Sequence, residues 1–132
     1  MVRVAGTNST LDRQLRGATS ATAAAALNLP AGQRIERAYA CASFSALRSE
    51  RGVLYGCTDA LVFRPGSERH SRWDVPYGRI ERVELTSARW RSEPTVLVVC
   101  RAPVTRLEFG GLSEVECDEL VAFILDNMAR LS

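Results

Sequence analysis

Apolar and polar residues alternate along most of the chain that follows Gln33. In residues 35–47, Ile35, Tyr39 and Cys41 fall on one face of an extended chain, and the alanines at even positions fall on the other. A period of two is typical of a half-buried β-strand. The same pattern predicts seven antiparallel strands, at residues 35–47, 53–58, 61–63, 75–85, 88–91, 95–100 and 105–109. Their inward residues are expected to include Ile80, Val83, Leu85, Leu107 and Phe109.

The period changes from two to that of a helix after Gly110 and Gly111. Ser113 and Glu116 have the spacing of a capping box, in which the serine and the glutamate side chains each bind the other's backbone N–H. The apolar face that follows consists of Cys117, Leu120, Val121, Ile124, Met128 and Leu131. We therefore expect an amphipathic helix that closes the domain.

The first 30 residues have a different composition and predict an alanine-rich helix before a domain at 31–132. Ser9 or Thr10 is a suitable N-cap, and Pro30 a suitable stop. A thin apolar stripe recurs at helical spacing: Leu11, Leu15, Ala18, Thr22, Ala25 or Ala26, and Leu29. Such a stripe is too small for a core of its own. The helix is expected to lie on its own domain or on a partner.

The composition is that of one ordinary globular domain of 132 residues, 46% hydrophobic and 24% charged. No apolar run is long enough to span a membrane, and the N-terminus does not have the pattern of a secretory signal, so we expect a cytoplasmic protein. All 17 basic residues are arginine. A GC-rich bacterial or phage genome explains a lysine-free chain, and selection against lysine is the alternative.

The four cysteines do not have the spacing of a metal site. No C-x-x-C pair occurs among them (Cys41, Cys57, Cys100 and Cys117), and His70 is the only histidine in the sequence that could join them as a metal ligand. We expect reduced thiols packed in the interior. A disulfide between Cys41 and Cys57, on neighbouring predicted strands, is the alternative.

The chain resembles the pleckstrin-homology (PH)-like superfold, and within it bacterial PH and GRAM-type domains. The resemblance lies in the order of seven strands and one helix and in several short sequence segments. The segments are G52-V-L-Y-G-C-T-D-A-L-V-F63, V75-P-Y-G-R-I-E-R-V83, L107-E-F109 and L29-P-A-G-Q-R-I35. The resemblance covers residues 29–131. It implies a mainly β fold with a helix: two near-orthogonal sheets in a barrel, capped by the C-terminal helix.

No catalytic motif occurs in the sequence, so we expect neither an enzyme nor a cofactor. The resemblance implies a binding domain. PH domains often hold anionic headgroups through basic residues near strands one and two. The residues that would do so here are Arg48, Arg51, Arg64, Arg69 and Arg72. Residues 53–57 carry no basic side chain, and acidic residues are interleaved with the rest, which makes headgroup binding the second hypothesis.

The preferred hypothesis is binding of another protein or of a second copy of the chain. PH-like folds often accept a peptide between the fifth strand and the closing helix, which the resemblance extends to this chain. The tryptophans and their arginine neighbours, Trp73, Trp90, Arg89 and Arg91, are the expected anchors, if the rings are exposed and not in the core. A net charge of +2 and an acidic closing helix disfavour nucleic acid.

Overall fold

The computed structural model describes residues 29–44, 49–66, 72–87 and 93–131. In chain order they form β1 (Ile35–Phe44), β2 (Ser49–Cys57), β3 (Ala60–Pro65), β4 (Trp73–Pro76), the 3-10 turn η1 (Tyr77–Arg79), β5 (Ile80–Ser87), β6 (Pro94–Cys100), β7 (Thr105–Gly110) and α3 (Glu114–Arg130). A mainly β domain with a C-terminal helix is confirmed. The predicted N-terminal helix lies outside the described residues.

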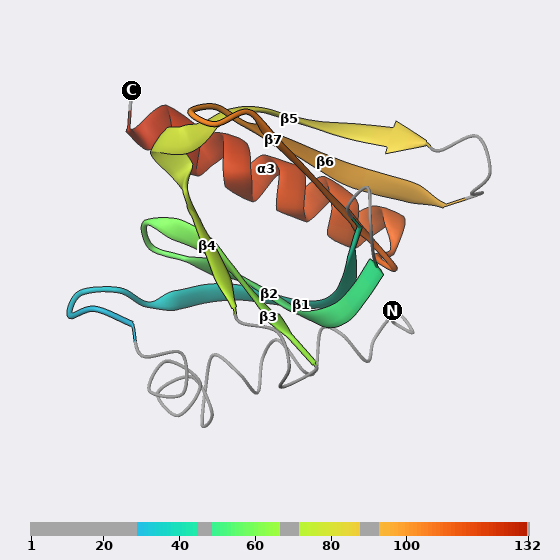
Figure 1. Ribbon diagram of the computed structural model, residues 1–132, viewed down its shortest axis with the longest axis horizontal. Helices are drawn as coiled ribbons and strands as arrows, with labels where there is room; N and C mark the ends of the chain where they lie inside the picture. The colour runs from blue at the N-terminus through green and yellow to red at the C-terminus, as the bar shows by residue number, and fades with distance from the viewer. Residues whose placement is uncertain (1–28, 45–48, 67–71, 88–92, 132) are drawn as a thin grey trace.

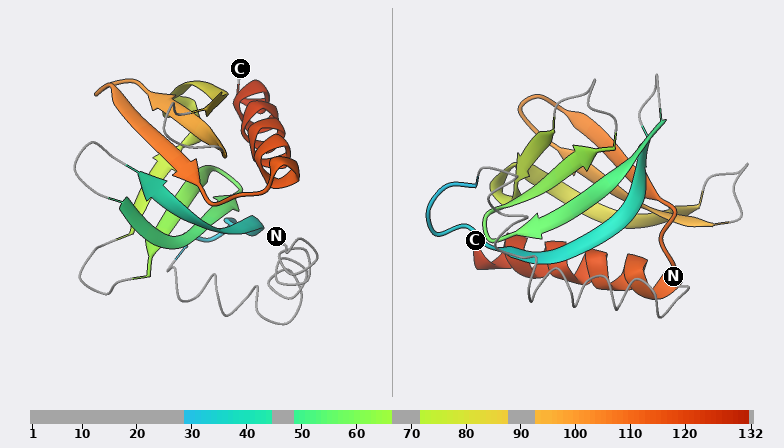
Figure 2. Two further views of the ribbon diagram at one scale, coloured as in Figure 1. Left: turned by 90° about the vertical axis from the view of Figure 1, so that its right-hand side faces the viewer. Right: turned by 90° about the horizontal axis from the view of Figure 1, so that it is seen from below.

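All seven strands belong to one antiparallel sheet, in the order β4-β3-β2-β1-β7-β6-β5 (Figure 1). β1 pairs with β2 along its whole length but with β7 only over Ala42–Phe44. The end of β1 therefore joins β2–β4 to β5–β7. The two separate sheets that we expected are not seen in the pairing. Figure 2 shows the sheet curling around its interior, with α3 along its open side.

The stretch predicted as a single fourth strand is two strands. Pro76 cannot donate a backbone hydrogen bond, and the chain makes the turn η1 before β5 begins. Tyr77 in this turn is buried; its hydroxyl donates to the Cys57 carbonyl at 2.7 Å, and its backbone N–H to the Asp59 carbonyl at 3.2 Å. These bonds tie the turn to the end of the β2–β3 hairpin. The strand predicted at 88–91 lies outside the described residues.

A register shift near the start of β1 changes which residues share a face. The pairing with β2 is irregular between Ile35 and Arg37, as in a β-bulge. Ile35 consequently packs with Ala38, whereas Tyr39 and Cys41 point to the opposite side. The predicted face that combined Ile35 with Tyr39 is therefore wrong, because strict alternation does not hold across a bulge.

The interior of the barrel is a single apolar cluster. It joins the inward residues of the sheet to α3: Tyr39, Cys41, Leu54, Leu61, Phe63, Val75, Tyr77, Ile80, Val96, Val98, Cys100, Phe109, Leu112, Cys117, Leu120, Phe123 and Ile124. Phe63 and Phe109 are fully buried, and α3 covers the side of the sheet where a Cβ on Gly56 would meet Phe123. The helix α3 thus closes the open side of the core.

A second apolar cluster lies on the other side of β1–β3, and we call it the outer cluster. It consists of Ile35, Ala38, Tyr55, Cys57 and Val62, with Leu29 and Val53 packed against it. The alternation in β2 explains it, since Leu54 points into the core and its neighbours point out. One sheet half therefore buries apolar residues on both faces.

The helix α3 begins as the sequence predicts. The Ser113 hydroxyl accepts from the Glu116 N–H at 3.1 Å, and the Ser113 N–H donates to the Glu116 carboxylate at 2.9 Å. Among the predicted apolar face, Leu131 is exposed, because the helix ends at Arg130 before this residue can turn inward. Phe123 and Asn127, which we did not assign to the buried face, lie in it.

Candidate interaction site

The strand β5 forms one end of the sheet. It is hydrogen-bonded to β6 and, among the described strands, to no other. Its side chains grade from core to surface: Ile80 is buried, Val83 is partly buried against the core, and Leu85 is 46% exposed. Leu85 was expected to face inward. It does lie opposite the buried Val96 in the register, but near the end of the strand, where cover is incomplete.

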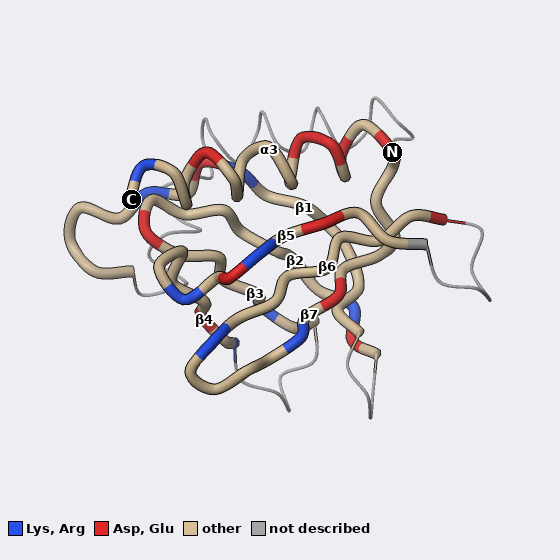
Figure 3. The backbone as a smooth tube through the Cα atoms, turned by 90° about the horizontal axis from the view of Figure 1, so that it is seen from above, with Lys and Arg blue, Asp and Glu red and all other residues tan. Residues whose placement is uncertain are grey.

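The helix α3 runs beside β5 in the opposite direction. Its first half lies near the end of β5, because the Cys117 thiol is 4.0 Å from the carbonyl of Pro94, the residue paired with Ser87. Its second half lies near the start of β5, because the rings of Phe123 and Tyr77 are 6.1 Å apart. Figure 3 shows the two elements side by side.

Leu125 lies on the side of α3 that is turned away from the pocket near β1. Phe123, Asn127 and Arg130 are on the side toward β1 and β2, and Val121 packs on the core. At 100° per residue, Leu125 follows Val121 on the side away from Phe123. It is 48% exposed. Leu85 and Leu125 are thus two half-exposed leucines toward opposite ends of the strip formed by β5 and this side of α3; we call this strip the β5–α3 edge.

The charge of the β5–α3 edge is negative. Arg82 lies 3.5 Å from the Glu81 carboxylate and 3.6 Å from that of Glu84, so on β5 one cation meets two anions. The helix carries five acidic residues and one basic residue, Arg130, in its last turn (Figure 3). Asp126 lines the pocket near β1 and Glu116 is buried in the capping box, so Glu114 and Asp118 are the carboxylates on the same side of the helix as Leu125. A positively charged ligand is therefore favoured along this edge.

The arginines predicted for headgroups are partly grouped. Arg51 and Arg64 are exposed and lie on the same face of the β2–β3 pair, since Val53 is paired with Arg64 and Arg51 is two residues before it. Arg51 belongs to β2 and not to the preceding loop. Arg72 is 3.3 Å from the Asp74 carboxylate. Arg48 and Arg69 lie outside the described residues.

Trp73 is not an exposed anchor. It begins β4 with its ring stacked on Phe63, 5.3 Å between centroids, and 5.8 Å from that of Phe109. It is partly buried against the core, because its pairing with Phe63 directs both rings inward. Of the four expected anchors, the other three, Trp90, Arg89 and Arg91, lie outside the described residues.

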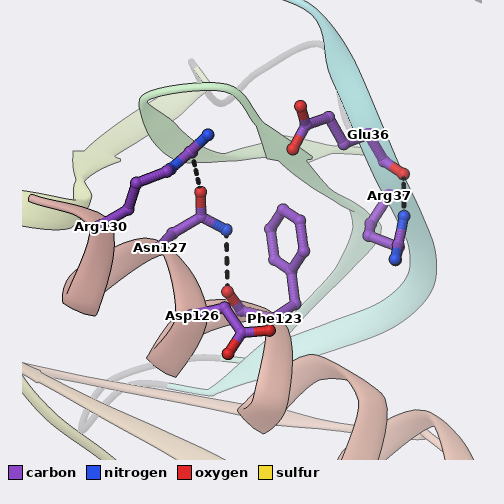
Figure 4. A pocket seen from close by; sticks show the side chains of 6 residues that line it. All are labelled: Glu36, Arg37, Phe123, Asp126, Asn127 and Arg130. Carbon is purple, nitrogen blue, oxygen red and sulfur yellow. Dashed lines mark hydrogen bonds between the residues drawn. The ribbon is translucent and has the colours of Figure 1, made fainter.

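A pocket at the end of α3, lined by Glu36, Arg37, Phe123, Asp126, Asn127 and Arg130, serves to hold the helix (Figure 4). The Asn127 amide donates to the Phe123 carbonyl at 2.8 Å and accepts from Arg130. Arg130 also donates to the Thr58 carbonyl at 3.0 Å. The Arg37 guanidinium lies 5.4 Å from the Phe123 ring centroid. Arg130 thus anchors the end of α3 to the β2–β3 turn.

All four cysteines are buried free thiols, as predicted. The alternative disulfide is excluded by the two faces of the sheet: Cys41 lies in the core and Cys57 in the outer cluster. Burial raises the pKa of the Cys41 and Cys57 thiols to about 12. These thiols are therefore protonated at neutral pH and weakly nucleophilic.

No three His, Cys, Asp or Glu side chains among residues 29–44, 49–66, 72–87 and 93–131 lie close enough together to hold a metal ion. Within the same ranges, no helix has the length and apolar character needed to cross a bilayer.

Solved structures resemble this chain in fold. A C-terminal domain of an unknown protein from Leishmania infantum matches with a TM-score of 0.66 and 13% identity, over 82% of this chain and 93% of that one. The Vps36 N-terminal PH domain matches with a TM-score of 0.64 and 7% identity, over 78% and 84%. The N-terminal PH domain of human ARAP2 matches with a TM-score of 0.60 and 13% identity, over 73% and 81%.

This chain has a PH-like fold. At these identities the likeness extends to the fold and no further. No family model matches the sequence, and no curated protein matches it either.

The sequence contains one signal for the β5–α3 edge that the predicted apolar face did not include. Leu125 is an apolar residue outside the predicted apolar face of the closing helix, on a helix otherwise rich in acidic residues. An apolar residue on the polar side of an amphipathic helix is a candidate contact. Its proximity to an end strand could not be read from the sequence.

Proposed function

We propose that this chain is a non-catalytic PH-like module that binds a basic segment of another protein at the β5–α3 edge. The main support for this proposal is that two half-exposed leucines, Leu85 and Leu125, lie on an acidic strip along the end strand β5. A partner strand can add to β5 through main-chain hydrogen bonds, while its apolar side chains contact the leucines. Basic residues of the partner would offset the charge of Glu81, Glu84 and Asp118.

Further parts of the proposal rest on the sequence. The matching phrases and arginine-only composition support a bacterial or phage chain of the GRAM type. Buried free thiols support the cytoplasm, where cysteines stay reduced. The basic segment can belong to a second copy, since the N-terminal 35 residues carry four arginines and one aspartate. Homo-oligomeric assembly is therefore included.

Selection of peptides from a random library on the immobilised protein tests the proposal. We expect enrichment of basic peptides with alternating apolar residues, and binding that weakens as salt rises. Leu85→Arg and Leu125→Arg should each weaken binding about tenfold, or roughly 1.4 kcal/mol. Val104→Arg, at an exposed apolar residue away from this edge, is the matched control. No enrichment, or equal weakening by all three variants, would contradict the proposal.

Self-association is measured separately by sedimentation velocity across a hundredfold range of concentration. A dimer that Leu85→Arg abolishes and Val104→Arg retains would identify a second copy as the partner. A monomer throughout would leave a different protein as the partner.

Peripheral binding of anionic headgroups is the second candidate, supported by Arg51 and Arg64 on one face of β2–β3. It is tested by co-flotation with neutral and anionic vesicles at low and physiological salt. Salt-sensitive flotation with anionic vesicles alone, lost in Arg51→Gln/Arg64→Gln, would favour it. Flotation with neither vesicle would contradict it.

A further inference from the structure

Charges of opposite sign lie at the two ends of the β5–α3 edge. The exposed carboxylates of Glu114 and Asp118 lie on the first half of α3, near the end of β5. Arg79 immediately precedes β5, and the Arg101 N–H donates to its carbonyl at 3.0 Å, so both arginines lie at the start of the strand. Neither forms an ion pair with a described residue, and Glu81, also near the start, is already paired on its own strand. The edge is therefore negative at one end and positive at the other.

The exposed apolar residues of this edge are separated in the same way. Leu85 is 46% exposed near the end of β5, and Leu125 is 48% exposed on the second half of α3, near the start of β5. A surface whose two ends complement each other can pair with a copy of itself that is turned by 180° about a two-fold axis. The unpaired side of β5 suits this rotation, because a two-fold axis perpendicular to a sheet makes two edge strands antiparallel.

We propose that β5 of a second copy pairs with β5 in antiparallel fashion, about a two-fold axis at Val83, so that one continuous sheet runs through a dimer. The inference rests on the proposed use of the β5–α3 edge for strand addition. The pairing brings Leu85 of each copy next to Leu125 of the other copy. It also brings the carboxylates on the first half of each α3 toward the arginines at the start of the other β5.

Side-chain direction and charge select this axis. Residues directly opposite each other in an antiparallel pair share a face of the sheet, so the axis must pass through a residue and not between two residues. An axis at Val83 sets Arg82 of one copy opposite Glu84 of the other, and this pair occurs twice in the dimer. An axis at Arg82 or at Glu84 would instead set two like charges opposite each other.

Disulfide formation between two single variants tests the contact between the two ends. Full-length Leu85→Cys and Leu125→Cys proteins are mixed, left to exchange subunits, oxidised and separated by non-reducing electrophoresis. We expect a covalent dimer in the mixture and in neither variant alone, because each residue lies next to the other one across the axis and far from its own counterpart. The unaltered chain, whose four cysteines are buried, is the control and should form none.

Sedimentation velocity of charge variants tests the register. Arg82→Glu and Glu84→Arg should each weaken the dimer about tenfold, because each change sets like charges opposite each other at two symmetric positions. The double variant Arg82→Glu/Glu84→Arg should restore the dimer. A basic peptide should instead bind the Arg82→Glu protein more tightly, since the edge becomes more negative. This variant therefore separates a second copy from a peptide as the partner.

The failure of this inference differs from the failure of the proposed function. Basic peptides that bind at the edge of a chain that is monomeric at every concentration would overturn the dimer and leave the proposed function intact. A dimer that is cross-linked between positions 85 and 125, with no enrichment of peptides, would support the inference and contradict peptide binding. A dimer without the mixed disulfide, or without restoration in the double variant, would overturn pairing about Val83.

Discussion

The ring of Phe123 occupies the space where a side chain on Gly56 would begin. A Cβ on Gly56 would lie 2.4 Å from Phe123 Cε2, far inside contact distance. The same ring meets Tyr77 edge-on, and the Arg37 guanidinium lies over it. The second half of α3 is thus seated directly on the backbone of β2, and Gly56 is what permits this.

Gly56→Ala should lower the free energy of unfolding by about 1–3 kcal/mol, because overpacking forces the helix or the strand to shift. Urea denaturation measures this. Gly78→Ala is the matched control, since a Cβ there meets no atom within 4 Å, and a change within about 0.5 kcal/mol is expected. Equal effects of the two changes would refute the close seating of α3 on β2.

Trp73→Ala should destabilise the fold by about 2–4 kcal/mol, because its ring fills space between Phe63 and Phe109. Thermal and urea unfolding would report the loss. Val104→Ala, at an exposed residue, should change stability little. A Trp73→Ala protein of normal stability that had lost partner binding would instead return Trp73 to the role of an anchor.

Ser113→Ala should cost about 1 kcal/mol, because it leaves the Glu116 N–H without its cap. Ser113→Asp should retain most of the stability, since a carboxylate also accepts this bond and suits the positive end of the helix. Both are measured by urea denaturation at neutral pH. If Ser113→Asp proves as unstable as Ser113→Ala, the cap is not what stabilises the start of α3.

Alkaline pH should destabilise the protein, because its buried thiols keep their protons to a higher pH in the folded chain than in the unfolded chain. Burial raises the pKa of the Cys41 and Cys57 thiols from 9.0 to about 12, so the unfolded chain loses these protons first. Their contribution is complete below pH 9 and is lost progressively as pH rises from 9 toward 12. Burial also raises the pKa of Tyr77, which acts in the same direction above pH 10.

Urea midpoints at pH 8 and pH 10.5 under reducing conditions measure this loss. Cys57→Ala should show a smaller decrease between the two pH values than the unaltered chain, whatever its stability at pH 8. Identical decreases in the two proteins would show that Cys57 does not carry the effect.

Part of the site could be anticipated from the sequence, and part could not. The predicted groove lay between the closing helix and a fifth strand at residues 88–91, which lie outside the described residues; the strand found beside α3 at the end of the sheet is β5, part of the stretch predicted as the fourth strand. The exposure of Leu85 did not follow from the sequence, because alternation assigns a face but not the cover over that face. The sequence did not decide whether Trp73 lies in the core or on the surface. In the structure Trp73 packs against the core, because it is paired with Phe63.

Local signals in the sequence determined most of the strands, the closing helix and its capping box, because each depends on neighbouring residues within a few positions. The tertiary structure decided how these elements use their faces. The bulge after Ile35 moved one residue to the outer cluster, and the turn at Tyr77 divided a predicted strand in two. Burial on both sides of β1–β3 likewise depends on segments distant in the chain. Such features follow from packing between elements, which a single-residue pattern does not contain.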